Sequence, residues 1–435
     1  MNAIAGSQLS YEALRETFTS AESKHDRLGL DYELMPYRLL DGGTVYYDRG
    51  VKPLMLALAA NYNVAPILAN HILTGVDLPV GKMRYGAGSQ INVDIPEAIE
   101  LDSLSHRLRA YLDAVVPVAQ SLGLAFTSLA YHPDRDPASI QIISKQRYPV
   151  MQRRFRTSGT RGLHVMTCAA AMTVRVSVRN EKDAIEKFRA AVLLTPIIQA
   201  LFANSPMDRG RMISAQSQRV MSWFDVDRAR TSFFLEAFDP SMSYDRYIDW
   251  ALNVPALGID REGRAIDVGD ISFKECLTTG KLYIGPEDWR GHLDTLWPAV
   301  RLTPRGLELR MADTGTPTAA MALLALVKGA IVEPSARKAL LNILKHTGDF
   351  GRLPLKAARF GLFAASEHGL LIDQARAAVR VARGGLKHLD PQEVRYLAPL
   401  EDALADAEAP ADEIRERYGR DWKDIHSMFT GTRII

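Results

Sequence analysis

Four short segments of this chain alternate apolar with polar residues, and this pattern constrains the fold more than any other feature. Successive side chains of a β-strand point to opposite faces, so each segment would have one apolar and one polar face. Such alternation is typical of an antiparallel sheet with one face in the core. The segments are Leu30–Leu34, Gln90–Ile95, Thr173–Val178 and Leu307–Met311.

The polar positions of these segments carry ion-binding groups, whereas an ordinary solvent-facing strand carries Lys, Thr and Glu in mixed order. They are Asp31, Glu33, Gln90, Asp94, Arg175, Glu308 and Arg310. Contact with water explains any single polar row, but the four rows together favour a cavity. Carboxylates suit a divalent cation, and guanidinium groups suit anionic oxygens. A curved sheet with this face inside would bind magnesium and a nucleoside triphosphate.

The last of these segments leads directly into a predicted helix. Thr316 followed by Pro317 is typical of a helix N-cap and first turn, and the apolar run Ala319–Val332 continues it. This run contains Lys328 and is shorter than the roughly 20 residues that a membrane span needs. We therefore expect a buried helix and no membrane partner.

Apolar residues at helical spacing predict further helices at Ser10–Thr19, Asp102–Leu122 and Lys182–Phe202. From about residue 334 to residue 435 the pattern is almost wholly helical. Breaks are expected there at Gly348–Pro354, Gly384-Gly385 and Ala409-Pro410. No linker or repeat interrupts the chain, so residues 1–435 are predicted to form one domain, with 334–435 packed on the sheet as a cover.

Composition narrows the class of protein. With 53 basic and 51 acidic side chains, the chain has no strong global attraction for nucleic acid.

A basic run contains Lys145, Arg147, Arg153, Arg154, Arg156 and Arg161. With Tyr148 and Phe155 between its basic residues, the run suggests RNA binding, but it is equally explained as a charged loop and helix surface, or as a segment in which Arg147 and some neighbours face nucleotide phosphates. Cys168 and Cys276 are too few for a disulfide framework. The first residues lack the pattern of a signal peptide, so a cytoplasmic location is expected.

Several motifs occur in a fixed order along the chain. They are Phe188–Pro206, Tyr247–Pro255, Asp288–Leu293 and Leu307–Asp313. These motifs resemble the plant and bacterial glutamate–cysteine ligase family, of the type 2, ergothioneine-pathway kind, with this chain as a divergent member. The order and spacing match from Gly29 to Trp422, so the resemblance covers nearly the whole chain.

This resemblance implies an α+β fold related to the glutamine synthetase catalytic core, with a curved antiparallel sheet, outer helices and a funnel-shaped active site. The fold agrees with the alternating segments. It also implies ATP and Mg²⁺, which serve to phosphorylate the side-chain carboxylate of glutamate before the amine of cysteine attacks the acyl phosphate. The expected partners are small amino-acid substrates, and an oligomer is possible.

The resemblance also assigns roles to residues at matching positions. Catalytic positions are matched by Glu308, Arg310 and Glu33. The residues expected near the metal ions are Glu33, Asp31 and Glu308. Those expected to bind substrate are Arg219, Trp223, Arg230, Thr231 and Gln90. Nucleotide binding is expected of Arg175, Arg147 and Thr173.

Two of the substrate positions have structural alternatives. Trp223 either contacts the substrate or belongs to the core. Arg230 either binds substrate or pairs with Asp225 or Asp227 as a surface ion pair, which would contribute little to stability.

Three positions depart from the family pattern. Thr173 and Arg175 stand where the family has a Gln-Val-Asn strand, and Asn92 stands where a glutamate is usual. The change at Asn92 removes one carboxylate near the metal ions. The guanidinium of Arg175 either repels one magnesium ion or replaces it by neutralising phosphate directly.

Three hypotheses follow. The chain makes γ-glutamylcysteine or a near relative, or it performs the same ligation on a different acid and amine in specialised metabolism. The third is a homologue without catalysis that binds a nucleotide or amino acid. Retention of Glu33, Glu308 and Arg310 favours an enzyme, whereas Asn92 and Arg175 favour a changed substrate.

Overall fold

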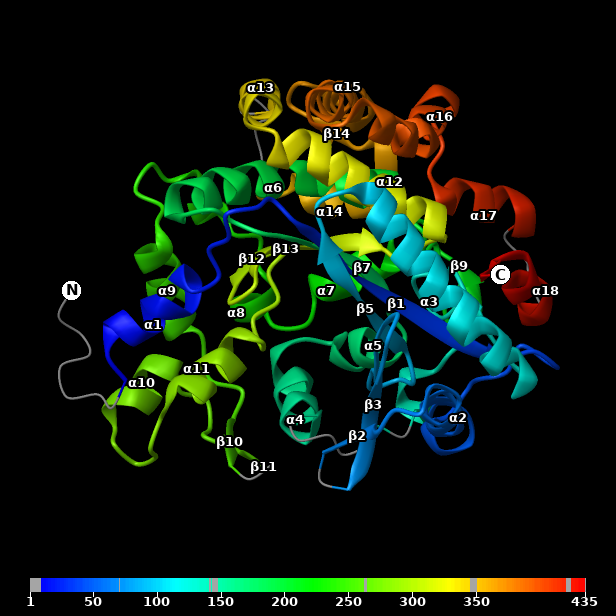
Figure 1. Ribbon diagram of the computed structural model, residues 1–435, viewed down its shortest axis with the longest axis horizontal. Helices are drawn as coiled ribbons and strands as arrows, with labels where there is room; N and C mark the ends of the chain where they lie inside the picture. The colour runs from blue at the N-terminus through cyan, green and yellow to red at the C-terminus, as the bar shows by residue number, and fades with distance from the viewer. Residues whose placement is uncertain are drawn as a thin grey trace.

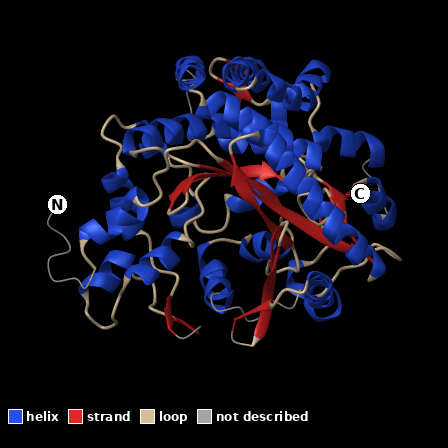
Figure 2. Ribbon diagram, in the orientation of Figure 1, coloured by secondary structure: helices blue, strands red, loops and turns tan. Residues whose placement is uncertain are grey.

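The computed structural model describes residues 9–69, 71–140, 142, 148–261, 264–344, 350–419 and 424–434. A ten-stranded antiparallel sheet runs through the middle of the molecule, as the red strands of Figure 2 show. Its strands lie in the order β12 (Val300–Thr303), β13 (Gly306–Asp313), β7 (Ala171–Val176), β1 (Leu28–Arg38), β5 (Ile91–Ala98), β4 (Gly81–Tyr85), β3 (Ile72–Leu78) and β2 (Pro66–Ala69). Strand β6 (Leu124–Thr127) also pairs with β1, and β16 (Arg433–Ile434) pairs with β6.

The four alternating segments are neighbours in this sheet, in the order β13, β7, β1 and β5. Asp31 on β1 lies opposite Thr173 on one side and Asp94 on the other. Glu308 on β13 lies opposite Arg175 on β7. The predicted antiparallel sheet is therefore confirmed, and its register gathers the polar side chains of all four segments on one face.

Helices cover the apolar face of the sheet, above it in Figure 1. They are α3 (Leu101–Ser121), α6 (Glu181–Leu201) and α12 (Pro317–Val327). All three were predicted. The ends of α3 and α6 differ from the predicted ends by a few residues at most, whereas α12 ends earlier than predicted. Thr316 caps α12 by accepting a hydrogen bond from the backbone N–H of Ala319 at 3.2 Å. The helix then continues as the π-helical turn Lys328–Val332, so the predicted run is helical to its end.

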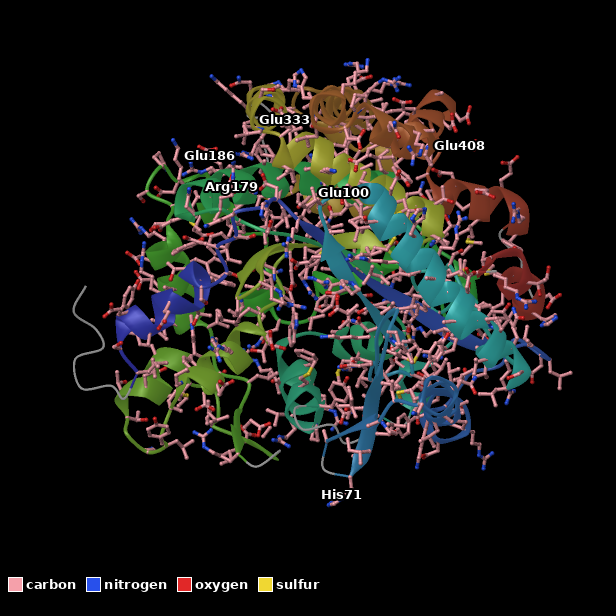
Figure 3. The ribbon with its side chains drawn as sticks, in the orientation of Figure 1. His71, Glu100, Arg179, Glu186, Glu333 and Glu408 are labelled. Atoms are coloured by element: carbon pink, nitrogen blue, oxygen red, sulfur yellow. The ribbon has the colours of Figure 1, made fainter. Side chains whose placement is uncertain are left out.

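The polar face is covered by a different set of helices, below the sheet in Figure 1. They are α4 (Tyr148–Ser158), α5 (Gly162–Thr167) and α7 (Gln218–Trp223). Beyond them, at one end, lie α1 (Tyr11–Thr19), α8 (Arg228–Thr231), α9 (Tyr244–Asn253), α10 (Phe273–Thr278) and α11 (Pro286–Leu293), with the hairpin of β10 (Ile259–Arg261) and β11 (Arg264–Ile266). The short pair β8 (Met207–Asp208) and β9 (Arg211–Met212) precedes α7. Helix α2 (Lys52–Tyr62) packs beside the β2–β3 hairpin, whose tip carries His71 (Figure 3).

The C-terminal segment is mainly helical, as predicted. Its elements are α13 (Pro334–Leu344), α14 (Leu353–Phe360), β14 (Ala365–Ser366), β15 (Gly369–Leu370), α15 (Leu371–Leu389), α16 (Ala398–Asp406), α17 (Pro410–Tyr418) and α18 (Ile425–Gly431). Helices α13 and α15 pack on α6, and α15 also packs on α12, so these two helices form a second helical layer. Phe429 of α18 stacks on Tyr37 of β1, so the end of the segment contacts the sheet itself. Within the described residues, no single helix is long and apolar enough to cross a membrane. The bent pair Pro317–Val332 and Pro334–Leu344, at 91°, passes that test by length and composition only.

The expected helix break at Gly384-Gly385 is wrong, because α15 runs through both residues. Gly385 instead permits close contact between α15 and the π-helical turn. A Cβ atom on Gly385 would lie 2.0 Å from the carbonyl oxygen of Gly329, and one on Gly329 would lie 2.1 Å from that of Ala382. Two glycines thus set the distance between the two helical layers.

We predict that Gly385→Ala lowers the free energy of unfolding by about 1–3 kcal/mol, because the added methyl group would force these layers apart. Gly384→Ala is the matched control, since nothing lies within 4 Å of a Cβ atom at that position. It should be neutral or stabilising, as alanine favours the helix. Urea denaturation measures both, and equal effects of the two variants would contradict the contact.

Candidate active site

A cavity of about 370 Å³ lies on the polar face of the sheet, between the strands and helices α4, α5 and α7. The structure brings most of the predicted site residues to its wall: Asp31, Glu33, Gln90, Thr173, Arg219, Trp223, Glu308 and Arg310. These residues come from β1, β7, β13, α7 and the turn before β5. Arg147 lies outside the described residues. The polar rows of separate strands therefore line one shared cavity.

Glu308 is the most heavily paired acid of this cavity. Its Oε2 accepts a hydrogen bond from Nε of Arg301 at 2.8 Å and lies 3.5 Å from Nη1 of Arg310. Burial opposes ionisation of this side chain, but the nearby guanidinium groups lower the pKa of Glu308 to about 2. Burial and the charge of Arg301 lower the pKa of Arg310 to about 10. Both groups are therefore ionised at neutral pH.

Glu33 is a second carboxylate on the cavity wall, and it is half-buried. Its Oε2 accepts a hydrogen bond from the backbone N–H of Ala171 at 2.7 Å. Burial raises the pKa of Glu33, against the opposing charges of Arg219 and Arg310. This side chain is held in place by the neighbouring strand, and a cation arriving with a substrate would favour its charged form.

Arg219 reaches the cavity from the first turn of α7. Its Nη2 donates to the carbonyl oxygen of Arg310 at 2.6 Å, and its Nη1 lies 3.3 Å from Oδ1 of Asp313. Asp313 is buried and also accepts hydrogen bonds from the hydroxyls of Ser205 and Ser217. Because Ser217 is the N-cap of α7, Asp313 joins the end of β13 to the start of the helix that carries Arg219. Asp313 was not among the predicted site residues.

The cavity has an apolar side opposite its charged strands. Trp223 lines it and also packs against Trp297, with ring centroids 6.1 Å apart, whereas its contact with a substrate stays a prediction. The other apolar side chains on this side are Tyr85, Tyr148, Met151, Phe155, Val165 and Met166. One ligand end can therefore be flat or hydrophobic while the other carries charge.

Gln90 lines the cavity, but its side-chain amide is bonded to the backbone. Its Oε1 accepts from the N–H of Gly88 at 2.8 Å, and its Nε2 donates to the carbonyls of Met166 and Ala169 at 3.2 and 2.9 Å. It precedes β5, which begins at Ile91. These bonds give Gln90 a structural task, because they tie the turn before β5 to α5.

Arg230 and Thr231 need a correction, because neither lies on the cavity wall. Arg230 is 0% exposed, and its guanidinium bonds to Asp227 at 3.1 Å, to the hydroxyl of Thr295 at 3.0 Å and to the carbonyl of Pro255. Thr231 donates to the carbonyl of Asp227 at 3.0 Å. The alternative of an Arg230–Asp227 ion pair is right about the partner but wrong about the surface location. These residues join α8 to the segments around it and leave no group for a substrate.

Arg175 also departs from its predicted nucleotide-binding role. It is 2% exposed, lies outside the cavity wall and pairs with Asp31 and Asp94. Burial opposes its charge, but these two carboxylates raise the pKa of Arg175. Its guanidinium faces carboxylates of the protein.

Several charged residues of the wall were missed in the sequence: Arg84, Asp294, Arg301 and Arg305. Two of these residues lie in segments that alternate apolar with polar residues, as the four recognised segments do. Arg301 occupies a polar position in the alternating strand Val300–Thr303, and Arg84 does so in Gly81–Tyr85. Both strands are short, which makes the alternation hard to distinguish from chance.

The charges of the wall favour an anionic ligand. The described lining contains five arginines and four carboxylates, with the arginines Arg84, Arg219, Arg301, Arg305 and Arg310. Arginine binds carboxylate and phosphate through paired hydrogen bonds. A phosphate chain and a substrate carboxylate would both be attracted to this surface.

A preformed metal centre is absent from the described residues, which contain no group of three or more His, Cys, Asp or Glu side chains arranged to hold an ion. Mg²⁺, however, commonly binds through one or two carboxylates together with substrate phosphates. Glu33 fits that requirement, and so does Oε1 of Glu308, because Arg301 and Arg310 approach only its Oε2. These residues would hold a magnesium ion that arrives with a nucleotide.

Comparison with known proteins identifies the family. A model described as Glutamate-cysteine ligase family 2 matches residues 89–431. The chloroplastic glutamate–cysteine ligase of Arabidopsis thaliana is 28% identical over 404 residues, covering 91% of this chain and 77% of that protein. The chloroplastic glutamate–cysteine ligase B of Oryza sativa subsp. japonica is 26% identical over 405 residues, covering 91% and 81%.

A solved structure shows the same fold. The glutamate–cysteine ligase of Francisella tularensis in complex with AMP superposes with a TM-score of 0.60, covering 94% of this chain and 89% of that chain at 12% identity. The fold class expected from the sequence is thereby confirmed. Because the family model spans most of its length, the chain belongs to glutamate-cysteine ligase family 2 and is a carbon–nitrogen ligase.

Proposed function

We propose that this chain is an ATP- and Mg²⁺-dependent ligase that joins the side-chain carboxylate of glutamate, or a similar acid, to the amine of cysteine or a related amino acid. One observation carries the proposal: Glu308, Arg310, Glu33 and Arg219 converge in a single cavity. The names of the plant relatives, both glutamate–cysteine ligases, support this choice of substrates.

The proposed chemistry solves the problem that a carboxylate is a poor electrophile. A carboxylate oxygen of the acid attacks the γ-phosphorus of ATP, which releases ADP and leaves an acyl phosphate. The amine nitrogen then attacks the acyl carbon, phosphate departs with the oxygen that had joined the two, and the nitrogen loses a proton. Both steps involve charge on phosphoryl oxygens, so fixed cations around them lower the barrier.

The arginines of the cavity supply most of these fixed cations. Glu308 holds Arg301 and Arg310 at the strand surface, so these guanidinium groups are oriented before any substrate binds. Arg219 is fixed by Asp313 in the same way from the helix side. Magnesium, when bound by Glu33 and Glu308, would add neutralisation of the phosphate charge.

A different acid or amine is the second candidate. The apolar side chains of the cavity wall, among them Tyr85, Phe155, Trp223 and Trp297, would suit an amine that carries a larger hydrophobic group than cysteine. The chemistry at the charged strands would be unchanged. A homologue without catalysis is less well supported, because the ion pairs of Glu308 preserve the charge arrangement that the reaction needs.

We predict that the purified protein releases ADP over many turnovers only when Mg²⁺, an amino-acid carboxylate and an amine are all present. A coupled ADP assay of glutamate and related acids, crossed with cysteine and other amines, measures this. Turnover with glutamate and cysteine supports the proposal as stated, and turnover only with a larger amine selects the second candidate. No ADP with any pair, and no protection by ATP against thermal unfolding, would contradict the ligase.

Glu308→Gln should abolish ADP formation, because the amide cannot neutralise Arg301 and Arg310 or bind a cation. Glu393→Gln is a matched control, since Glu393 is a buried carboxylate paired with Lys328 and lies outside the cavity wall. Both variants lose a buried ion pair, so activity is compared per folded molecule, with folding measured by circular dichroism. A fully active Glu308→Gln enzyme would refute the site assignment.

A further inference from the structure

Two carboxylates face each other across neighbouring strands at the edge of the cavity. Asp31 on β1 and Asp94 on β5 are directly opposite in the register. Like charges in such cross-strand positions repel each other and destabilise a sheet. A cation between them removes the repulsion, and either a divalent metal ion or a cationic side chain could supply it.

The guanidinium of Arg175 occupies this position. It comes from β7, on the other side of β1, and its Nη1 bonds to Asp31 while its Nη2 lies 2.5 Å from Oδ1 of Asp94. Its Nε is 3.7 Å from the carboxylate of Glu97. The second oxygen of Asp94 lies 3.5 Å from Arg305. Three acids from two strands therefore surround one buried cation.

The neighbouring backbone leaves room for this side chain. Gly29 lies opposite Arg175 in the register between β1 and β7. A Cβ atom on Gly29 would lie only 2.7 Å from Nη2 of Arg175. The absence of a side chain at Gly29 thus lets the arginine cross β1 and reach Asp94 on the next strand. Residues of the three strands β1, β5 and β7 together form this cation position.

We infer that Arg175 is a built-in cation that replaces a divalent metal ion between Asp31 and Asp94. Mg²⁺ demands near-octahedral oxygen ligands at about 2.0–2.1 Å, which these carboxylates cannot offer while a guanidinium lies between them. Divalent cations of the reaction are then restricted to the side of the cavity that carries Glu33 and Glu308. This last step rests on the proposed function, whereas the replacement itself does not.

The consequence is a site whose charge depends less on the metal concentration. A guanidinium stays protonated in proteins and does not dissociate, so it offsets part of the charge of these three carboxylates before any ligand binds. Asp31, although predicted as a metal ligand, becomes the partner of a protein cation. Arg175, which departs from the family pattern, therefore serves as a fixed positive charge between two acidic side chains.

The test counts the Mn²⁺ ions bound to the protein by electron paramagnetic resonance, with and without a non-hydrolysable ATP analogue, because the ion at Glu33 and Glu308 is expected to arrive with the nucleotide. Asp94→Asn should leave Mn²⁺ binding unchanged in the otherwise unaltered protein, because Asp94 serves a guanidinium. A loss of bound Mn²⁺ in this variant would overturn the inference. This arm needs no change at Arg175 and no turnover.

A second arm removes the cation itself. Arg175→Met should gain one Mn²⁺ ion per chain, and adding Asp94→Asn should remove that ion again. No gain in a folded Arg175→Met protein would overturn the inference, and if this variant does not fold, the Asp94→Asn arm still decides. If Arg175→Met gains an Mn²⁺ ion but the unaltered protein forms no ADP with any substrate pair, the inference about Arg175 stands and the proposed ligase function is contradicted.

Arg337→Met is the matched control. Arg337 is also buried and pairs with two carboxylates, Asp183 and Glu186. Figure 3 labels Glu186 on α6, on the opposite side of the sheet from the cavity. Lys187 still neutralises Asp183 in this variant, so we expect no gain of Mn²⁺. An equal gain here would show that any exposed acidic pair binds Mn²⁺ and would overturn the assignment.

Discussion

The register between β13 and its neighbours controls most of this structure, because it decides which charges meet on the polar face. It places Glu308 beside Arg301 and opposite Arg175, so buried acids and bases alternate across the strands. A shift of one residue would turn these charges into the core and the apolar residues into the cavity. Breaking a single buried pair leaves an uncompensated charge, which is strongly destabilising. The fold and the electrostatics of the cavity are therefore set by the same pairing.

The two faces of the sheet serve different purposes. The apolar face packs on α3, α6 and α12, and a second helical layer then packs on α6 and α12. This double layer stabilises the sheet from behind. On the other face, short helices and the connecting segments cover the sheet less completely, and the cavity lies between them and the strands. A rigid sheet with charged side chains on its open side is well suited to hold preorganised cations for phosphoryl transfer.

The sequence was most informative where a side chain's direction follows from strand periodicity. Alternation alone placed Glu33, Glu308 and Arg310 on one face, and the Thr316 cap located α12. It was least informative where the outcome depends on which partner is nearest in space. Arg230 and Arg175 have the composition of ligand-binding residues but are satisfied by carboxylates within the protein. The partners of Arg175 are carboxylates of two other strands, far away along the chain. Arg230 pairs with Asp227, only three residues before it, but its burial depends on contacts with Thr295 and Pro255, which no local pattern encodes. The contact at Gly385 was missed for the same reason.

The central claim is that this cavity activates a carboxylate by phosphorylation. It is tested most directly by supplying the acid with oxygen-18 in its side-chain carboxylate and analysing the released phosphate by mass spectrometry. An acyl phosphate requires that one labelled oxygen leave with the phosphate while the other stays in the amide product. Unlabelled phosphate, or label found in AMP with release of pyrophosphate, would contradict the account.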